Sequence, residues 1–158
     1  MTPKTLNPTF PQHLIAGFRF GEGLLRKNLA GMSDPQGAAR PAADHNNALW
    51  VAGHITYWRS QIVAMLGGEP VWAEGEAEVF KGMKRASPPA TDGWTLRQVM
   101  SAYDQATERL YSALGTGAPP AEGGEQLVGG LGSLALHEAY HVGQLGTLRR
   151  LAGLAGVA

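Results

Sequence analysis

Two histidines that lie four residues apart are the part of the sequence best suited to chemistry. His137 and His141 stand in the segment LHEAYHVGQ, which runs from Leu136 to Gln144. Four residues of an α-helix rotate the chain about 40° beyond a full turn, so both imidazoles can face one ion. Neutral imidazole binds zinc, nickel, iron and copper, and a pair on one helical face provides half of a metal site. The alternative is that both are surface or core histidines without a ligand role, but their spacing favours metal binding.

The same segment spells H-E-x-x-H, the signature with which zincin metalloproteases bind zinc and provide a glutamate as general base. These proteases take a third ligand further along the chain, either a glutamate or the last histidine of H-E-x-x-H-x-x-G-x-x-H. After His141 the sequence has no histidine, aspartate or glutamate, and Gln144 and Thr147 occupy the glycine and histidine positions. The sequence therefore excludes such a protease. We expect Glu138 to be solvated, or to support a metal ligand through a hydrogen bond.

A third metal ligand must then come from the preceding part of the chain, where His13, His45 and His54 are available. His13 and His45 lie at the starts of predicted helices, where water can satisfy them. His54 lies in the middle of an apolar helix among tryptophans, and an unsatisfied buried polar group costs about 1–3 kcal/mol. Taken alone, His54 is better explained as a hydrogen-bonded core residue. The histidine pair that lacks its third ligand favours His54 as that ligand.

Three histidine ligands leave one coordination position for water or substrate, as in catalytic zinc sites rather than closed structural ones. Side chains that share the face of His54 or lie near His137 are expected to line a substrate pocket. These side chains are Tyr57, Trp58, Tyr140 and Gln144. Core packing is the alternative explanation for the aromatic residues. No catalytic residue is assigned, although Glu138, Tyr57 and Tyr140 are candidates for proton transfer in a hydrolase.

Four segments with helical periodicity must position these residues, and glycine- and proline-rich stretches separate them. The predicted helices span residues 12–29, 44–66, 92 or 95–114 and 133–151. Helices of about 18–22 residues are about 27–33 Å long, which suits a bundle. The sequence therefore predicts an all-α four-helix bundle, as a single domain over residues 1–158, with a long connection between the second and third helices.

The ends of these helices carry residues that can cap them. Asp44, Asn46 or Asn47 can accept backbone N–H bonds at the start of the second helix, and Ser133 can do so for the fourth. A short helical turn around residues 77–83 is compatible with the long connection.

The composition restricts the location and the partners of the protein. Thirteen basic residues balance thirteen acidic ones, so no net charge attracts the chain to nucleic acid or to an anionic membrane. Because there is no cysteine, metal ligands must be nitrogen or oxygen atoms. The first eleven residues lack the apolar segment of a signal peptide, and no apolar run approaches the ~20 residues of a membrane span. We therefore expect a cytoplasmic protein.

The segments around the three histidines resemble the DinB/YfiT-like metalloprotein superfamily. The segment ALWVAGHI, Ala48 to Ile55, precedes HEAYHVGQL, His137 to Leu145, and the order and spacing of the helices agree over nearly the whole chain. This resemblance implies a four-helix bundle that holds a divalent metal ion, commonly zinc or nickel, on histidines of the second and fourth helices. His54, His137 and His141 occupy those three positions.

The resemblance also implies a range of activities. Some relatives are thiol-dependent transferases or isomerases that use mycothiol or bacillithiol, and dimers are common among them. Our leading hypothesis is a metal-dependent enzyme that acts on a small molecule, either as a thiol-dependent S-transferase or as a hydrolase. A low-molecular-weight thiol is the candidate partner, and a homodimer is the candidate assembly. The alternatives are a non-catalytic metal- or ligand-binding stress-response protein and a metal-free helical interaction protein. Zinc and nickel are the first choices from this resemblance, but the residues alone do not choose among zinc, nickel, iron and manganese, because imidazole suits several of them.

Overall fold

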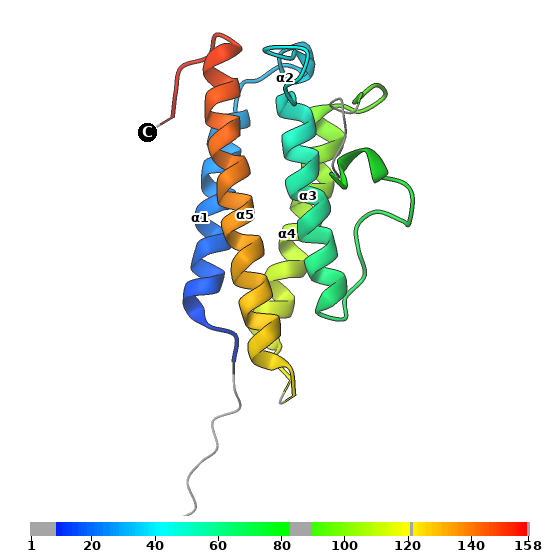
Figure 1. Cartoon of the computed structure of the whole chain (residues 1–158), viewed down its shortest axis with the longest axis vertical. Coiled ribbons are helices and arrows are strands. Elements are labelled where there is room, and N and C mark those ends of the chain that lie inside the picture. Colours follow the sequence, from blue (N-terminus) through cyan, green and yellow to red (C-terminus); the bar gives the residue numbers. More distant parts are fainter. Residues whose placement is uncertain (1–8, 83–89, 121, 158) are drawn as a thin grey trace, which may run out of the picture.

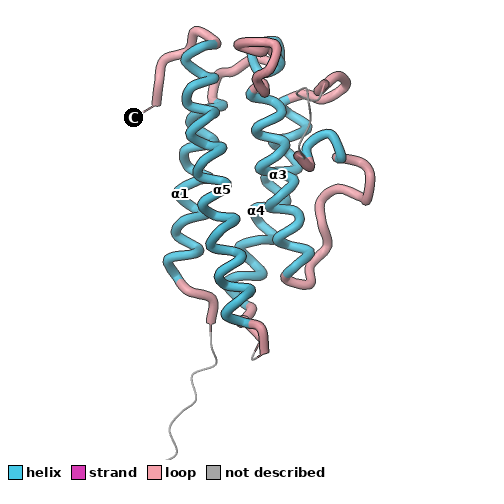
Figure 2. The backbone as a smooth tube through the Cα atoms, viewed as in Figure 1, coloured by secondary structure: helices cyan, strands magenta, loops and turns pink. Residues whose placement is uncertain are grey.

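Four long helices form a bundle in the computed structural model, which describes residues 9–82, 90–120 and 122–157 (Figure 1). These helices are α1 (Gln12–Leu29), α3 (Ala48–Met65), α4 (Leu96–Thr116) and α5 (Gly124–Leu151). Helix α1 packs against α5, and α3 packs against both α4 and α5. The described residues contain helices and loops but no strand (Figure 2). The predicted all-α four-helix bundle is confirmed.

Two short helices lie in the connections between the long ones. Helix α2 (Asp34–Ala38), which the sequence analysis did not predict, begins at a capping box in which Ser33 and Gln36 bond to each other's backbone N–H groups. The 3₁₀ helix η1 (Glu78–Phe80) lies within the predicted turn of residues 77–83. Met83, the last residue of that prediction, lies outside the described residues. In the described ranges, no helix has the length and apolar character that crossing a membrane requires.

The predicted starts of α1 and α4 agree with the structure, whereas the predicted start of α3 does not. Helix α1 has the predicted bounds, and α4 starts after Thr95, whose hydroxyl accepts the N–H of Gln98. Helix α3 starts at Ala48 rather than at residue 44, because Asn47 is the cap: its Oδ1 accepts the N–H of Trp50 at 2.7 Å. Of the three candidate caps for this helix, the third is therefore the one used.

The start of α5 was predicted wrongly. The helix begins at Gly124, and Ser133 lies well inside it, where its hydroxyl donates to the carbonyl oxygen of Gly129. Glycines at 129, 130 and 132 each disfavour a helix by about 1 kcal/mol relative to alanine, and they suggested a break. Packing outweighs this cost, because Leu131 is fully buried in the bundle core.

A buried ion pair links all four long helices at the centre of the bundle. Arg59 of α3 is completely buried, and its Nε and Nη2 donate to the two carboxylate oxygens of Glu138 of α5 at 2.8 and 2.7 Å. Its other hydrogen bonds go to the hydroxyl of Thr107 on α4 at 2.7 Å and the carbonyl oxygen of Phe18 on α1 at 2.9 Å. Burial by itself would lower the pKa of Arg59, but the hydrogen bonds and charge of Glu138 raise it.

The expectation for Glu138 was therefore wrong. Its side chain is neither solvated nor directed at a histidine, because both carboxylate oxygens accept hydrogen bonds from Arg59. Helix α1 comes close enough to cover this carboxylate only because residue 21 is glycine: a Cβ there would lie 2.5 Å from Glu138 Oε1. Glu138 is thus a buried structural residue on the side of α5 that faces α1.

Candidate metal centre

Three histidines from two helices meet between α3 and α5. The Nε2 atom of His137 lies 3.3 Å from His54 Nε2 and 3.0 Å from His141 Nε2. All three candidate ligand atoms lie within 4.8 Å of one another, and the cluster could hold a metal ion. The structure brings together the three residues that the sequence predicted, while His13 and His45 are exposed and take no part in the cluster.

The separations between the nitrogen atoms fit coordination of one ion. Imidazole nitrogens bind zinc at about 2.0–2.1 Å, so two ligands of a tetrahedral ion lie about 3.3 Å apart. The two short Nε2–Nε2 distances, 3.3 and 3.0 Å, are close to this spacing.

The hydrogen bonds on the other side of the rings determine which nitrogen carries the proton. The Nδ1 atom of His54 lies 2.7 Å from the carbonyl oxygen of Phe80, which can only accept, so Nδ1 donates and Nε2 keeps its lone pair. The Nδ1 atom of His141 donates in the same way to Gln144 Oε1 at 2.8 Å, while Gln144 Nε2 donates to the hydroxyl of Tyr140 at 3.0 Å. Two lone pairs therefore point at His137, whose single ring proton can satisfy only one of them. A cation would satisfy all three nitrogens, so the donor set fits a metal ion.

Burial keeps these three imidazoles neutral. Desolvation lowers the pKa of His54 to about 4, although the hydrogen bond to Phe80 opposes this shift. Desolvation also lowers the pKa values of His137 and His141. Neutral imidazole is the form that binds metal, so the ring nitrogens are available as ligands at pH 7 without first losing a proton.

The connection between α3 and α4 reaches His54 because one residue of α3 and one residue of the connection are glycines. Phe80 is fully buried, and a Cβ on Gly53 would overlap its ring. Gly82 has a φ of +66°, and a Cβ there would lie 2.7 Å from His54 Cε1. Glycine adopts this left-handed conformation without strain and leaves room for the ring. Both glycines thus allow the connection to pack against the histidine that it orients.

A comparison with protein-family models places most of the chain in one family. The model described as the DinB superfamily matches residues 18–145, a range that includes all three histidines of the cluster. The chain belongs to the DinB superfamily. The resemblance inferred from the two histidine segments is thereby confirmed. Comparisons with curated proteins and with solved structures found no significant match.

Three of the four predicted pocket residues contact the histidines of this DinB-superfamily protein. The ring of half-buried Trp58 lies 6.3 and 6.0 Å from the rings of His54 and His137. The ring of Tyr140, which is largely exposed, lies 5.0 Å from that of His141. Gln144 makes the hydrogen bond to His141 described above. The indole Nε1–H of Trp58 is buried and has no hydrogen-bond partner in the described residues, which leaves one donor beside the cluster.

The fourth predicted pocket residue lies further away. Tyr57 is half-buried and packs its ring against Trp58, with 5.9 Å between the ring centroids. It lines a separate cavity of about 340 Å³ formed with the connection between α3 and α4. Trp50, a buried core residue on the same helix, stacks on His54 at 4.7 Å and donates its indole N–H to the carbonyl oxygen of Val79 at 2.7 Å.

Sequence reasoning missed two features that support this DinB-superfamily site. The carbonyl oxygen of Phe80 orients His54, but every residue has such a carbonyl, so no sequence signal marks it. The Arg59–Glu138 pair had a signal: each is a charged residue inside a helix that also carries a ligand histidine and is otherwise largely apolar. Because a buried charge needs a partner of opposite sign, the two could have been paired from the sequence.

Proposed function

We propose that this DinB-superfamily protein is a metal-dependent enzyme that acts on a small molecule, with the metal on His54, His137 and His141. The observation that carries the proposal is the convergence of three Nε2 atoms, two of which have their lone pairs directed inward by hydrogen bonds at Nδ1. A divalent ion held there would lower the pKa of a bound water or thiol, or would polarise a carbonyl group. Zinc and nickel, both of which bind neutral imidazole, are the first candidates for the ion.

The surrounding residues of the chain would bind and orient the substrate. The unpartnered indole N–H of Trp58 would donate to an oxygen or sulfur atom of the substrate. Tyr140 is the remaining candidate for proton transfer, since Arg59 occupies both oxygens of Glu138 and Tyr57 lines a separate cavity. A thiol substrate would make the protein an S-transferase, and a water nucleophile would make it a hydrolase. In both cases, the open position beside the three histidines is where the substrate binds.

The metal content of purified protein tests the ligand set. Wild-type protein prepared without chelators should carry about one divalent ion per chain, and His137→Ala should carry almost none, because two ligands seldom retain an open-site metal. His13→Ala is the matched control, since His13 is exposed and lies outside the cluster. Elemental analysis measures all three proteins. A His137→Ala protein that keeps a stoichiometric ion would refute the three-histidine site.

The reaction class needs a second measurement on the metal-loaded protein. Low-molecular-weight thiols with electrophilic acceptors, and separately ester and amide substrates, should reveal turnover that is lost in His137→Ala. Trp58→Phe, which removes the unpartnered donor but keeps an aromatic ring beside the histidines, should keep the metal and lower kcat/KM by about tenfold, the order expected for one hydrogen bond to a charged atom. Stoichiometric metal with no turnover in either panel would instead support the non-catalytic binding protein.

A further inference from the structure

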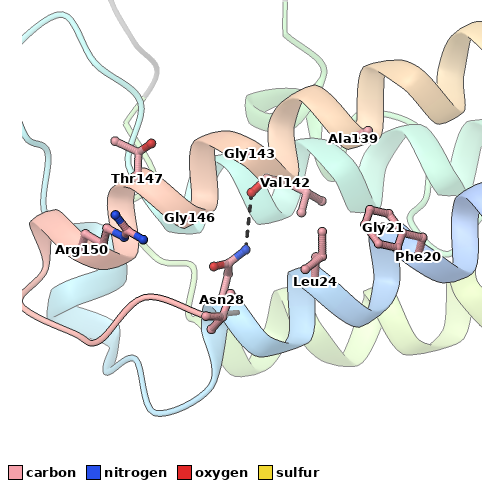
Figure 3. A pocket seen from close by; sticks show the side chains of 11 residues that line it. Phe20, Gly21, Leu24, Asn28, Ala139, Val142, Gly143, Gly146, Thr147 and Arg150 are labelled. Atoms are coloured by element: carbon pink, nitrogen blue, oxygen red, sulfur yellow. Dashed lines mark hydrogen bonds between the residues drawn. The ribbon is translucent and has the colours of Figure 1, made fainter.

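A second cavity lies between α1 and α5 (Figure 3), and no histidine is among the residues that line it. Its volume is about 350 Å³. Phe20, Leu24 and Asn28 line it from α1, and α5 contributes Val142, Arg150 and several residues without bulky side chains. We call this cavity the α1–α5 groove. None of the groups proposed for the metal centre lines it.

Two polar groups in the groove have no hydrogen-bond partner among the described residues. Asn28 is only 4% exposed; its amide nitrogen donates to the carbonyl oxygen of Val142 at 3.5 Å, but its Oδ1 is buried and has no partner. A buried acceptor without a donor costs about 1–3 kcal/mol. Figure 3 shows this oxygen turned toward the Arg150 end of the groove, beside Gly146. The guanidinium of Arg150 also has no hydrogen bond or ion pair within the described ranges.

The other end of the groove is apolar. Phe20 is 67% exposed, which is unusual for a phenylalanine, and Leu24 and Val142 lie between it and Asn28. No acidic side chain is among the described residues that line the groove. Glu138, whose carboxylate lies against Gly21 behind the groove, is paired with Arg59. The groove therefore has a single positive charge at one end, an uncompensated acceptor in the middle and an apolar surface at the other end.

We propose that the α1–α5 groove binds an amphipathic monocarboxylate that carries a hydroxyl group near its carboxylate. The carboxylate binds the Arg150 guanidinium, the hydroxyl donates to Asn28 Oδ1, and the hydrocarbon chain lies along Leu24 and Val142 toward Phe20. From Phe20 to Asn28, α1 rises about 12 Å, which suits a chain of medium length. The volume lies at the lower end of the ~300–1,000 Å³ typical of small-molecule sites, which suits a ligand with a single hydrocarbon chain.

Calorimetric titration with three ligands, each below its micelle-forming concentration, distinguishes the contributions of these contacts to binding. The full-length protein should bind 3-hydroxydecanoate, bind decanoate about three- to tenfold more weakly because it lacks the donor to Asn28, and not bind decyltrimethylammonium. Arg150→Gln should weaken 3-hydroxydecanoate binding by tenfold or more, since it removes a charge-assisted contact. Arg97→Gln is the matched control for the loss of one positive charge, because Arg97 is exposed on α4.

A second pair of variants tests the groove by placing a leucine inside it or outside it. No atom lies within 4 Å of a Cβ added at Gly143, so Gly143→Leu is accommodated on α5 and projects into the groove. Gly129→Leu, equally unobstructed on the same helix but outside the groove, is its control. Gly143→Leu should abolish carboxylate binding and Gly129→Leu should leave it unchanged.

Three results would overturn the proposal. They are no binding of 3-hydroxydecanoate, equal binding of it by Gly143→Leu and the wild type, or equal affinity of the wild type for decyltrimethylammonium and 3-hydroxydecanoate. A wild-type dimer that Gly143→Leu converts to a monomer, without carboxylate binding, would show that a second copy covers the groove instead. None of these readouts depends on the metal or on turnover, so failure of this proposal and failure of the proposed enzyme are distinguishable.

Discussion

The orientation of His141 depends on a residue one helical turn away on the same helix. Gln144 accepts the Nδ1 proton of His141 and donates to the hydroxyl of Tyr140, so three neighbouring side chains of α5 form one hydrogen-bonded chain. Such contacts fix the tautomer and the ring plane of a histidine ligand and increase its basicity. At the residue scale, the capacity to bind metal thus rests on the partners of the ligands as well as on the ligands.

Replacing Gln144 should weaken metal binding without removing a ligand. We expect Gln144→Leu to lower metal affinity by about 10- to 100-fold, because His141 loses the acceptor that holds its proton on Nδ1. Competition with a chromophoric chelator measures this affinity. Gln126→Leu, at an exposed position of the same helix, should bind metal like the wild type. Equal affinities for all three proteins would contradict a role for Gln144 in orienting His141.

The buried histidines also predict how the stability of the metal-free protein depends on pH. Burial lowers the pKa of His54 to about 4, whereas an unfolded histidine has a pKa of about 6.5. Between these values the unfolded chain binds the proton more readily than the folded chain. The free energy of unfolding should therefore fall as the pH decreases from about 6.5 to 4 and level off above 6.5. Urea unfolding at several pH values measures this, and His54→Gln should show a shallower decrease than the wild type. A parallel decrease in both proteins would exclude His54 as its source.

The connection between α3 and α4 is the element that completes the metal centre. It places Phe80 against Gly53, and the Phe80 ring packs on Trp72 and Trp94 with ring centroids 5.7 and 5.0 Å apart. The backbone carbonyl that orients His54 is therefore held by an aromatic cluster rather than by regular secondary structure. A substitution at Gly53 should therefore disturb the packing of this connection and lower the metal affinity of the site at the same time.

Gly53→Ala tests this link between an element and the site. A methyl group there would overlap the Phe80 ring, so the connection must move, at a cost of about 1–3 kcal/mol in the free energy of unfolding. Metal affinity should fall with it, because the Phe80 carbonyl shifts away from His54 Nδ1. Gly23→Ala is the control, since a Cβ at that exposed position of α1 meets no atom within 4 Å and should stabilise the helix slightly. Chemical denaturation and chelator competition measure the two effects. Unchanged metal affinity in Gly53→Ala would show that the connection does not orient the ligand.

Across the whole molecule, the Arg59–Glu138 pair holds the four helices in one arrangement. The pair lies between two clusters of apolar residues, and the Arg59 guanidinium lies 5.7 Å from the Phe18 ring and 4.6 Å from the Tyr103 ring, one from each cluster. Because Glu138 follows His137 directly, the ion pair also sets the rotation of α5 about its axis. The histidines then face α3 while the carboxylate faces the bundle centre.

Removing one partner of this pair should cost more than removing both. Arg59→Met leaves the Glu138 carboxylate buried without its partner, and we expect the metal-free protein to lose about 3–5 kcal/mol of stability. The double variant Arg59→Met/Glu138→Leu should regain much of this loss, because it leaves no buried charge. Urea denaturation of the single and double variants measures the coupling. Strictly additive losses would show that the two side chains do not act as a pair.

The sequence by itself was sufficient to predict the features that depend on residues close together along the chain. The bounds of α1, the existence of four helices and the shared face of His137 and His141 follow from helical periodicity. The absence of any downstream ligand, together with the mid-helix position of His54, then led to the complete histidine cluster.

Only the tertiary structure determined which groups from other segments contact each helical face. It placed Glu138 against Arg59 rather than in solvent, extended α5 through its glycines to Gly124, and brought the carbonyl oxygen of Phe80 to His54. It also formed the groove in which Asn28 Oδ1 has no partner. Helical spacing determines which side chains share a face. The group that the face contacts depends on packing between segments far apart in the chain, which no local pattern encodes.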